Sequence, residues 1–228
     1  MQSVYKLPIG MAVVDLADHG ELKLDQPVRV EHHELVPAAL HSPIRDLHPN
    51  GNFDMTAREL LRYAISESDG TASDVLLRLA GGPGRVMEYL RRIGAGNIAV
   101  ADTEAAISRA HDVQYRNWAT PDGAVELLEK VSQPLILTFM TETRTGLRRL
   151  KGMLPPGTVV AHKTGTSGTR NGVTAATNDI GLIFLPDGRR LAIAVFVSDS
   201  RAPEAVREGV IARIAKAVYD CELVSFAP

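Results

Sequence analysis

The segment DIGLIFLPDGRRLAIAVFVSDS, residues 179–200, contains two apolar runs separated by the turn formers Pro186, Asp187 and Gly188. A turn of this kind between two runs rich in aliphatic and β-branched residues predicts two antiparallel strands joined as a hairpin. The second run, LAIAVFV at 191–197, is apolar at consecutive positions. This pattern is typical of a strand buried on both faces in the middle of a sheet. The hairpin therefore predicts a layer built on an antiparallel sheet.

The segments on either side of the hairpin extend this layer. Residues 157–168, GTVVAHKTGTSG, predict a further strand that runs into a glycine-rich end, and residues 204–220 predict an amphipathic helix. The apolar face predicted for this helix consists of Val206, Val210, Ile214 and Ala217. Three strands leave the apolar run at 191–197 without a neighbour on one side, and an open edge of this kind favours aggregation. The pattern implies sheet partners that the sequence does not contain.

The chain before this layer reads mainly as helices. Thr56 and Glu59 form a capping box at the start of one predicted helix, and apolar residues recur at helical spacing before and after it. Residues 97–121 show no sustained period and predict a long loop, and loops of this length inside a compact domain are often functional. We therefore predict an α/β (α+β) fold with a separate helical lobe.

Composition narrows the class of protein. The chain has 228 residues, 45% of them hydrophobic, which is enough for one domain with a sizeable core. A formal net charge of −2 gives no reason to expect nucleic acid or an anionic membrane as a partner. No apolar run approaches the ~20 residues of a membrane helix. We expect a single domain over residues 1–228. Approximately residues 15–155 would form the helical lobe, and residues 156–228 the sheet and the terminal helix.

The histidines, the cysteine and the glycine clusters predict no metal or nucleotide site. His32 and His33 are adjacent, so on a strand they point to opposite faces. His41 and His48 lack the spacing of a helical zinc motif, and Cys221 is alone. We therefore expect no metal and no cofactor.

Three short motifs carry the chemistry. Ser3 and Lys6 are three residues apart at the start of a predicted helix, which places a hydroxyl and an amine on one face. The sequence Ser-Asp-Gly at 68–70 lies between two predicted helices, and Lys-Thr-Gly at 163–165 lies at the end of a predicted strand. Each motif alone is common, but the three together, in this order, are not expected by chance.

This set resembles the S-x-x-K, S-D-N and K-T-G motifs of class A β-lactamases and penicillin-binding proteins. The text TEAAIS at 103–108 looks like the Ω-loop of class A enzymes, and QSVYK, TGLRRLKGMLP and AHKTGTSG look most like an extended-spectrum subgroup with an enlarged Ω-loop. The resemblance covers Met1 to about Asp220. It implies a β-lactamase/transpeptidase-like fold, an antiparallel sheet flanked by helices plus an all-helical lobe, and hydrolysis of a β-lactam through a serine acyl-enzyme.

The resemblance also implies a role for each matching residue. Ser3 is expected to attack the β-lactam carbonyl, Lys6 to relay its proton, and Ser68 to pass a proton to the departing nitrogen. Lys163 is expected to attract the substrate carboxylate, and Glu104 to activate the water that releases the acyl group. The other positions expected to contact substrate are Gly70, Ser108, Arg149, Thr164, Gly165 and Thr166.

Two of these positions depart from the family pattern. Gly70 stands where the family has Asn, so a side-chain donor to the substrate is missing, and Ser108 stands where many relatives have Asn beside the deacylating water. The segment between Thr120 and Lys163 is also shorter than in the family. These departures leave two alternatives open: a peptidoglycan DD-peptidase, which would lack Glu104, or an inactive or deacylation-impaired penicillin-binding homologue. Glu104 itself has an alternative reading as a solvated loop carboxylate.

Members of this family have a signal peptide, a first helix and two strands before the nucleophile. None of these is found before Ser3, and the first residues lack the basic segment of a signal peptide. We therefore expect an N-terminally truncated chain. The resemblance implies a periplasmic or secreted protein and a small-molecule β-lactam as partner. A complete domain is expected to be a monomer, whereas the open strand edge predicts self-association of the chain as it stands.

Overall fold

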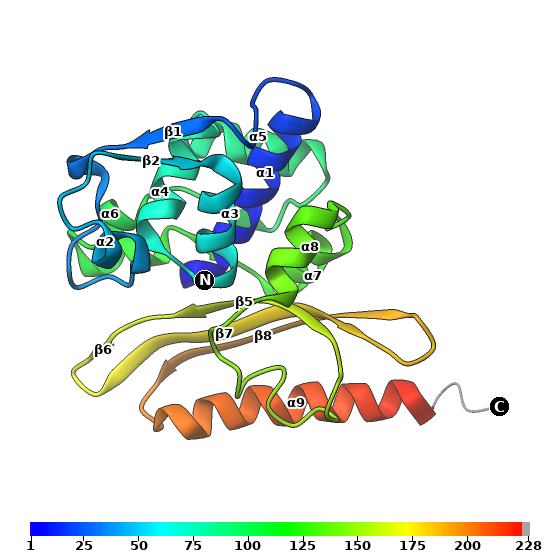
Figure 1. The fold of residues 1–228 in the computed structure, drawn as a ribbon. Helices are drawn as coiled ribbons and strands as arrows, with labels where there is room; N and C mark the ends of the chain where they lie inside the picture. Colours follow the sequence, from blue (N-terminus) through cyan, green and yellow to red (C-terminus); the bar gives the residue numbers. More distant parts are fainter. Residues whose placement is uncertain (225–228) are drawn as a thin grey trace.

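The computed structural model describes residues 1–224 and arranges them in three layers. Figure 1 shows the helical lobe on one face of an antiparallel sheet and the terminal helix α9 (Glu204–Val224) on the other face. The sheet is built from β5 (Val160–Thr166), β6 (Thr169–Arg170), β7 (Val173–Phe184) and β8 (Arg190–Ser200). The predicted α/β fold class is therefore confirmed.

The predicted hairpin is formed by β7 and β8. The two strands pair antiparallel, with Ile180 opposite Ala194 and Ile183 opposite Leu191. β7 pairs with β5 on its other side. It starts six residues earlier than the apolar run predicts, and Thr174–Asn178 in this additional part are buried.

The sequence prediction of a central strand at 191–197 needs a correction. β7 is the central strand, whereas β8 pairs only with β7 within residues 1–224. Within β8 only Ile193 and Val195 are buried, whereas β7 is buried continuously from Thr174 to Ile183. The expected open edge along β8 is accordingly present in the described part of the chain.

The buried face of α9 also differs from the prediction. Val206 and Ile214 are 49% and 41% exposed, so the predicted apolar face points largely to solvent. The residues buried against the sheet are Arg207, Glu208, Ile211, Ala212, Ala215 and Tyr219. The prediction was wrong because two charged residues belong to the buried face. Glu208 accepts from Arg149, and Arg207 donates to the Thr177 hydroxyl.

The helical lobe surrounds α1 (Lys6–Asp18), which is buried from Lys6 to Val14 and follows the 3₁₀ turn η1 (Gln2–Tyr5). The predicted capping box of Thr56 and Glu59 is present at the start of its neighbour α3. The other longer helices are α3 (Ala57–Ser66), α4 (Gly70–Leu79), α5 (Pro83–Arg92), α7 (Pro121–Glu129) and α8 (Pro134–Thr141). No helix within residues 1–224 is both long enough and apolar enough to cross a membrane.

Short elements connect these helices. The strands β1 (Pro27–Val30) and β2 (Phe53–Thr56) pair around η2 (His32–Glu34) and α2 (Pro43–Leu47). The segment predicted as one long loop at 97–121 is closed at its base by β3 (Ile98–Ala99) and β4 (Trp118–Ala119), and it contains α6 (Glu104–Ile107) and η3 (His111–Tyr115). Elements of two to five residues are too short to show a period in the sequence.

Candidate active site

A cleft of about 440 Å³ lies where the helical lobe meets the end of β5. It collects residues from η1, α1, the loop before α4, α6 and β5, which are far apart in the sequence. The predicted site residues on its surface are Ser3, Lys6, Ser68, Glu104, Ser108, Thr164 and Thr166. The three sequence motifs and the acidic residue of the 97–121 segment therefore meet in one place.

Lys6 is at the centre of this arrangement. Its side chain is 2% exposed, and its Nζ donates to the backbone oxygen of Ser68 at 2.7 Å and pairs with Glu104 Oε1 at 2.8 Å. Ser3 lies one turn earlier in η1 and also lines the cleft. A hydroxyl and an amine that share one helical face near a cleft are suited to nucleophilic catalysis.

Ser68 is held in an unusual backbone conformation. Its φ is +59°, in the left-handed region that non-glycine residues seldom adopt, and such strain is characteristic of functional sites. The next residue, Asp69, fixes the turn, because its buried carboxylate accepts from the backbone N–H groups of Ala72 and Ile44. The Ser68 hydroxyl accepts a hydrogen bond from Lys163 Nζ at 2.9 Å.

Lys163 lies behind the cleft surface on β5 and is fully buried. Burial lowers its pKa well below the ordinary value, and the positive charges of Lys6 and Arg149 add to this effect. Its Nζ also donates to the backbone oxygen of Thr164 at 3.0 Å. The arrangement links two lysines through Ser68, with one of them directly on a carboxylate.

Glu104 begins α6 and is 8% exposed, so the alternative of a solvated loop carboxylate is wrong. Burial would raise its pKa, but the charge and hydrogen bond of Lys6, with smaller contributions from Tyr5 and Lys163, bring the pKa below its usual value. The carboxylate is therefore ionised at neutral pH and can accept a proton.

Asp74 on α4 positions this acid, and the sequence reading missed it. Its two carboxylate oxygens accept from the backbone N–H groups of Glu104 and Ala105 at 2.7 and 2.9 Å. Burial raises the pKa of Asp74 to about 6 despite these bonds. Asp74 lies about one turn from the start of α4, but only the fold reveals that it reaches α6.

Comparison with known proteins gives the same family throughout. The Beta-lactamase enzyme family is matched over residues 1–221. The extended-spectrum β-lactamase PER-1 of Pseudomonas aeruginosa is 44% identical, with 98% of this chain and 75% of PER-1 covered. The solved structure of a β-lactamase from Chitinophaga pinensis is 45% identical with a TM-score of 0.93, and 97% of this chain and 85% of that one are covered. TLA-3, another extended-spectrum β-lactamase, is 44% identical with a TM-score of 0.92, over 96% of this chain and 83% of its own.

The chain belongs to the β-lactamase enzyme family. Its solved relatives include a representative of class A that is 38% identical with a TM-score of 0.89, over 96% of this chain and 82% of that one. The family resemblance expected from the motifs is confirmed.

Arg149 does not lie on the cleft of this β-lactamase, contrary to its predicted direct contact with substrate. It is 3% exposed, and its Nη2 donates to the Thr166 hydroxyl at 2.8 Å while Nε pairs with Glu208 at 3.2 Å. Any influence of Arg149 on a ligand therefore passes through Thr166. Gly165 is likewise covered, because a Cβ there would lie 2.4 Å from the backbone oxygen of Met1. Its lack of a side chain lets β5 approach η1.

Ser108 stays on the cleft, but its hydroxyl donates to the backbone oxygen of Ala105 at 2.7 Å. That bond closes α6, so the hydroxyl is engaged within the loop.

Gly70 is also covered, so the expectation of a substrate contact at this position needs a correction. Its backbone N–H donates to the His41 oxygen at 3.0 Å. A Cβ would lie 3.2 Å from that oxygen, 3.3 Å from Val36 and 3.4 Å from Glu104. The segment carrying His41 thus occupies the space that a side chain at this position would need.

Replacing Gly70 with alanine is therefore expected to destabilise the fold. Alanine gains about 0.5–1 kcal/mol over glycine within a helix, whereas overpacking costs typically about 1–3 kcal/mol. We expect a net loss on the order of 1 kcal/mol, measured by chemical denaturation. Gly84 in α5 is the matched control, because nothing lies within 4 Å of a Cβ there and G84A should be neutral or stabilising. Equal stability changes in G70A and G84A would show that position 70 has free space.

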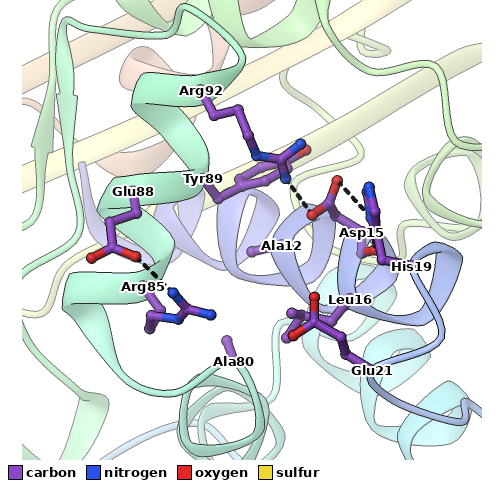
Figure 2. A pocket seen from close by; sticks show the side chains of 10 residues that line it. All are labelled: Ala12, Asp15, Leu16, His19, Glu21, Ala80, Arg85, Glu88, Tyr89 and Arg92. Carbon is purple, nitrogen blue, oxygen red and sulfur yellow. Dashed lines mark hydrogen bonds and ion pairs between the residues drawn. The ribbon is translucent and has the colours of Figure 1, made fainter.

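A second cavity of about 380 Å³ lies between the C-terminal half of α1 and α5 (Figure 2). Four of its charged side chains form ion pairs, Arg92 with Asp15 and Arg85 with Glu88 at 2.9 Å. Arg92 also lies over the ring of Tyr89. None of the motif residues lines this cavity, so we assign the active site to the first cleft.

Proposed function

We propose that this protein is a class A serine β-lactamase, which hydrolyses the β-lactam amide bond through an acyl-enzyme. Ser3 is the nucleophile, Lys6 the proton relay, Ser68 the donor to the leaving nitrogen and Glu104 the base for deacylation. The backbone N–H groups of Ser3 and Thr166 form the oxyanion hole, where the loss of one donor typically costs ~2.7–4 kcal/mol.

The contact between Glu104 and Lys6 at 2.8 Å carries this proposal. A peptidoglycan DD-peptidase with the same three motifs needs no carboxylate at this point. The buried carboxylate beside the lysine therefore favours an enzyme that releases its acyl group over one that retains it. Gly70 gives the substrate no side-chain donor. This absence supports a second candidate function, a homologue that acylates but releases product slowly.

A small-molecule β-lactam is the partner of this site. Lys163 acts on its carboxylate from behind the cleft surface, with Thr164 and Thr166 as hydroxyl contacts and Arg149 behind Thr166. The family resemblance supports a periplasmic or secreted location. The open edge of β8 supports self-association of this chain. A domain in which further strands cover that edge would be a monomer.

The intact mass of the protein, followed over time after mixing with a penicillin, tests the proposal. An adduct on Ser3 that forms and clears, with the appearance of hydrolysed drug, is the expected result. A lasting adduct would favour the second candidate. A folded protein that forms no adduct and hydrolyses no drug would contradict both.

A further inference from the structure

Two buried hydroxyl groups lie behind Glu104 and are not part of the mechanism above. Tyr5 in η1 and Ser73 in α4 are both 0% exposed. Neither hydroxyl has a hydrogen-bond partner of standard geometry within the described residues 1–224. Buried polar groups are rarely left unpaired, and a catalytic role is one explanation for a group that is. A phenylalanine and an alanine would fill this space without that penalty.

The position of Tyr5 ties it to the site. It lies between Ser3 and Lys6 in the sequence, on the turn that carries both. The groups that act on its hydroxyl are Glu104, Asp74 and Ser73. Burial, together with the negative charges of Glu104 and Asp74, raises the pKa of Tyr5 well above its usual value. The phenol therefore stays protonated and has a proton to donate.

Within residues 1–224 the Glu104 carboxylate lacks a second hydrogen-bond donor, and the Tyr5 hydroxyl can provide it. Lys6 holds Oε1 from the cleft side, and Asp74 holds the backbone of Glu104 and Ala105. Among the described residues, no other hydrogen bond or ion pair fixes the rotation of the carboxylate. Tyr5 is close enough to lower the pKa of Glu104, and its buried hydroxyl is unpaired. Ser73, whose buried hydroxyl is also unpaired, is close enough to lower the pKa of Tyr5.

We propose that Tyr5 is a positioning residue for Glu104: its hydroxyl, supported by Ser73, donates to the carboxylate from the side opposite Lys6 and keeps it ionised and oriented. The inference rests on the proposed function, in which Glu104 is the deacylation base. A donor to the ionised form lowers the pKa of a carboxyl group, so its removal raises that pKa. The base form of Glu104 would then be lost at a higher pH.

The effect of Tyr5 on the Glu104 titration must be distinguished from the effects of the other charged groups nearby. Lys6 on α1 and Lys163 on β5 also lower its pKa, while Asp74 on α4 titrates nearby. His41 and His111 line the same cleft. None of these is changed by Y5F, and labelling only the glutamates with ¹³C separates Glu104 from Asp74. The signal of Glu104 is identified by its loss in E104Q.

The test compares wild type, Y5F, S73A and Y5F/S73A by ¹³C titration of Glu104 and by the pH profile of deacylation. Y5F is expected to move the Glu104 titration and the acidic limb to higher pH and to slow deacylation at pH ~5 by about tenfold, as for a lost hydrogen bond to a charge. Acylation should be unchanged. S73A should have a smaller effect, and the double variant should match Y5F, because Ser73 acts through Tyr5.

The control is Y89F, which removes a mostly buried phenol beside the second cavity, away from Glu104. It should leave the Glu104 titration unchanged. Superimposable Glu104 titrations for wild type and Y5F would overturn the proposal, even if Y5F lowered the rate through misfolding. A wild-type protein that hydrolyses no β-lactam would contradict the proposed function alone, since the titration still decides whether Tyr5 acts on Glu104.

Discussion

Replacing Ser3 with alanine is expected to abolish covalent adduct formation with a penicillin and to lower kcat by a factor on the order of 10⁴ to 10⁶, as the loss of a serine nucleophile does elsewhere. The reason is chemical, because no other hydroxyl in the cleft has the same relation to Lys6. The Ser68 hydroxyl accepts from Lys163 Nζ, and the Ser108 hydroxyl donates to the backbone oxygen of Ala105. Hydrolysis of a chromogenic cephalosporin and intact mass measure the two effects.

S132A serves as the control for this substitution, because Ser132 is exposed and lies outside the cleft. It should match wild type in both rate and adduct. S3A should also keep the thermal stability of the wild type, since Ser3 is half-buried and its hydroxyl makes no hydrogen bond within residues 1–224. If S3A still forms the adduct, another residue is the nucleophile and the assignment of η1 as the catalytic turn is wrong.

Much of this site could be predicted because its chemistry sits in short motifs. Ser3 with Lys6, and Lys163 with Thr164, are each set by local geometry: one helical turn in the first case and adjacent strand positions in the second. The sequence therefore places the reactive groups on the correct elements. The contact of Ser68 with Lys163 at 2.9 Å spans 95 residues, and no local pattern in the sequence predicts it.

Other parts of the site depend on packing that no local pattern encodes. Asp74 reaches the backbone of α6 only because α4 and the 97–121 segment pack together. Gly70 appeared as a lost substrate contact, but the approach of the His41 backbone decides its role. Arg149 lies behind Thr166 because Glu208 on α9 holds it there, and this pairing also explains why the apolar face of α9 was misplaced. Buried charges break the simple rule that the apolar face points inward.

Replacing Glu104 with glutamine is expected to separate the two halves of the reaction. Glutamine has nearly the same shape, so its amide oxygen can still accept from Lys6, but it cannot take a proton from water. General-base catalysis contributes typically about 10²- to 10⁴-fold, so the deacylation rate should fall by that factor while the acyl-enzyme accumulates. Intact mass and single-turnover kinetics report the two steps separately.

The pH dependence of the wild type follows from the same carboxylate. Its pKa lies below the usual value because Lys6 and its other neighbours outweigh burial. Deacylation should therefore stay constant through neutral pH and fall only on the acidic side, as Glu104 gains a proton. E104Q should lose this acidic limb, because it has no carboxyl group to titrate. E129Q changes an exposed glutamate at the end of α7 and should keep the wild-type profile.

Stability must be measured alongside, because E104Q also leaves Lys6 without its buried counter-charge. Breaking a buried ion pair typically costs about 3–5 kcal/mol, although Lys163 can lessen this by losing its own proton. A folded E104Q that forms a lasting adduct assigns Glu104 to deacylation alone. A folded E104Q that forms no adduct makes the same carboxylate the base for acylation, with Lys6 holding it in place. Normal turnover would remove Glu104 from the mechanism and leave Lys6 as the base for both steps.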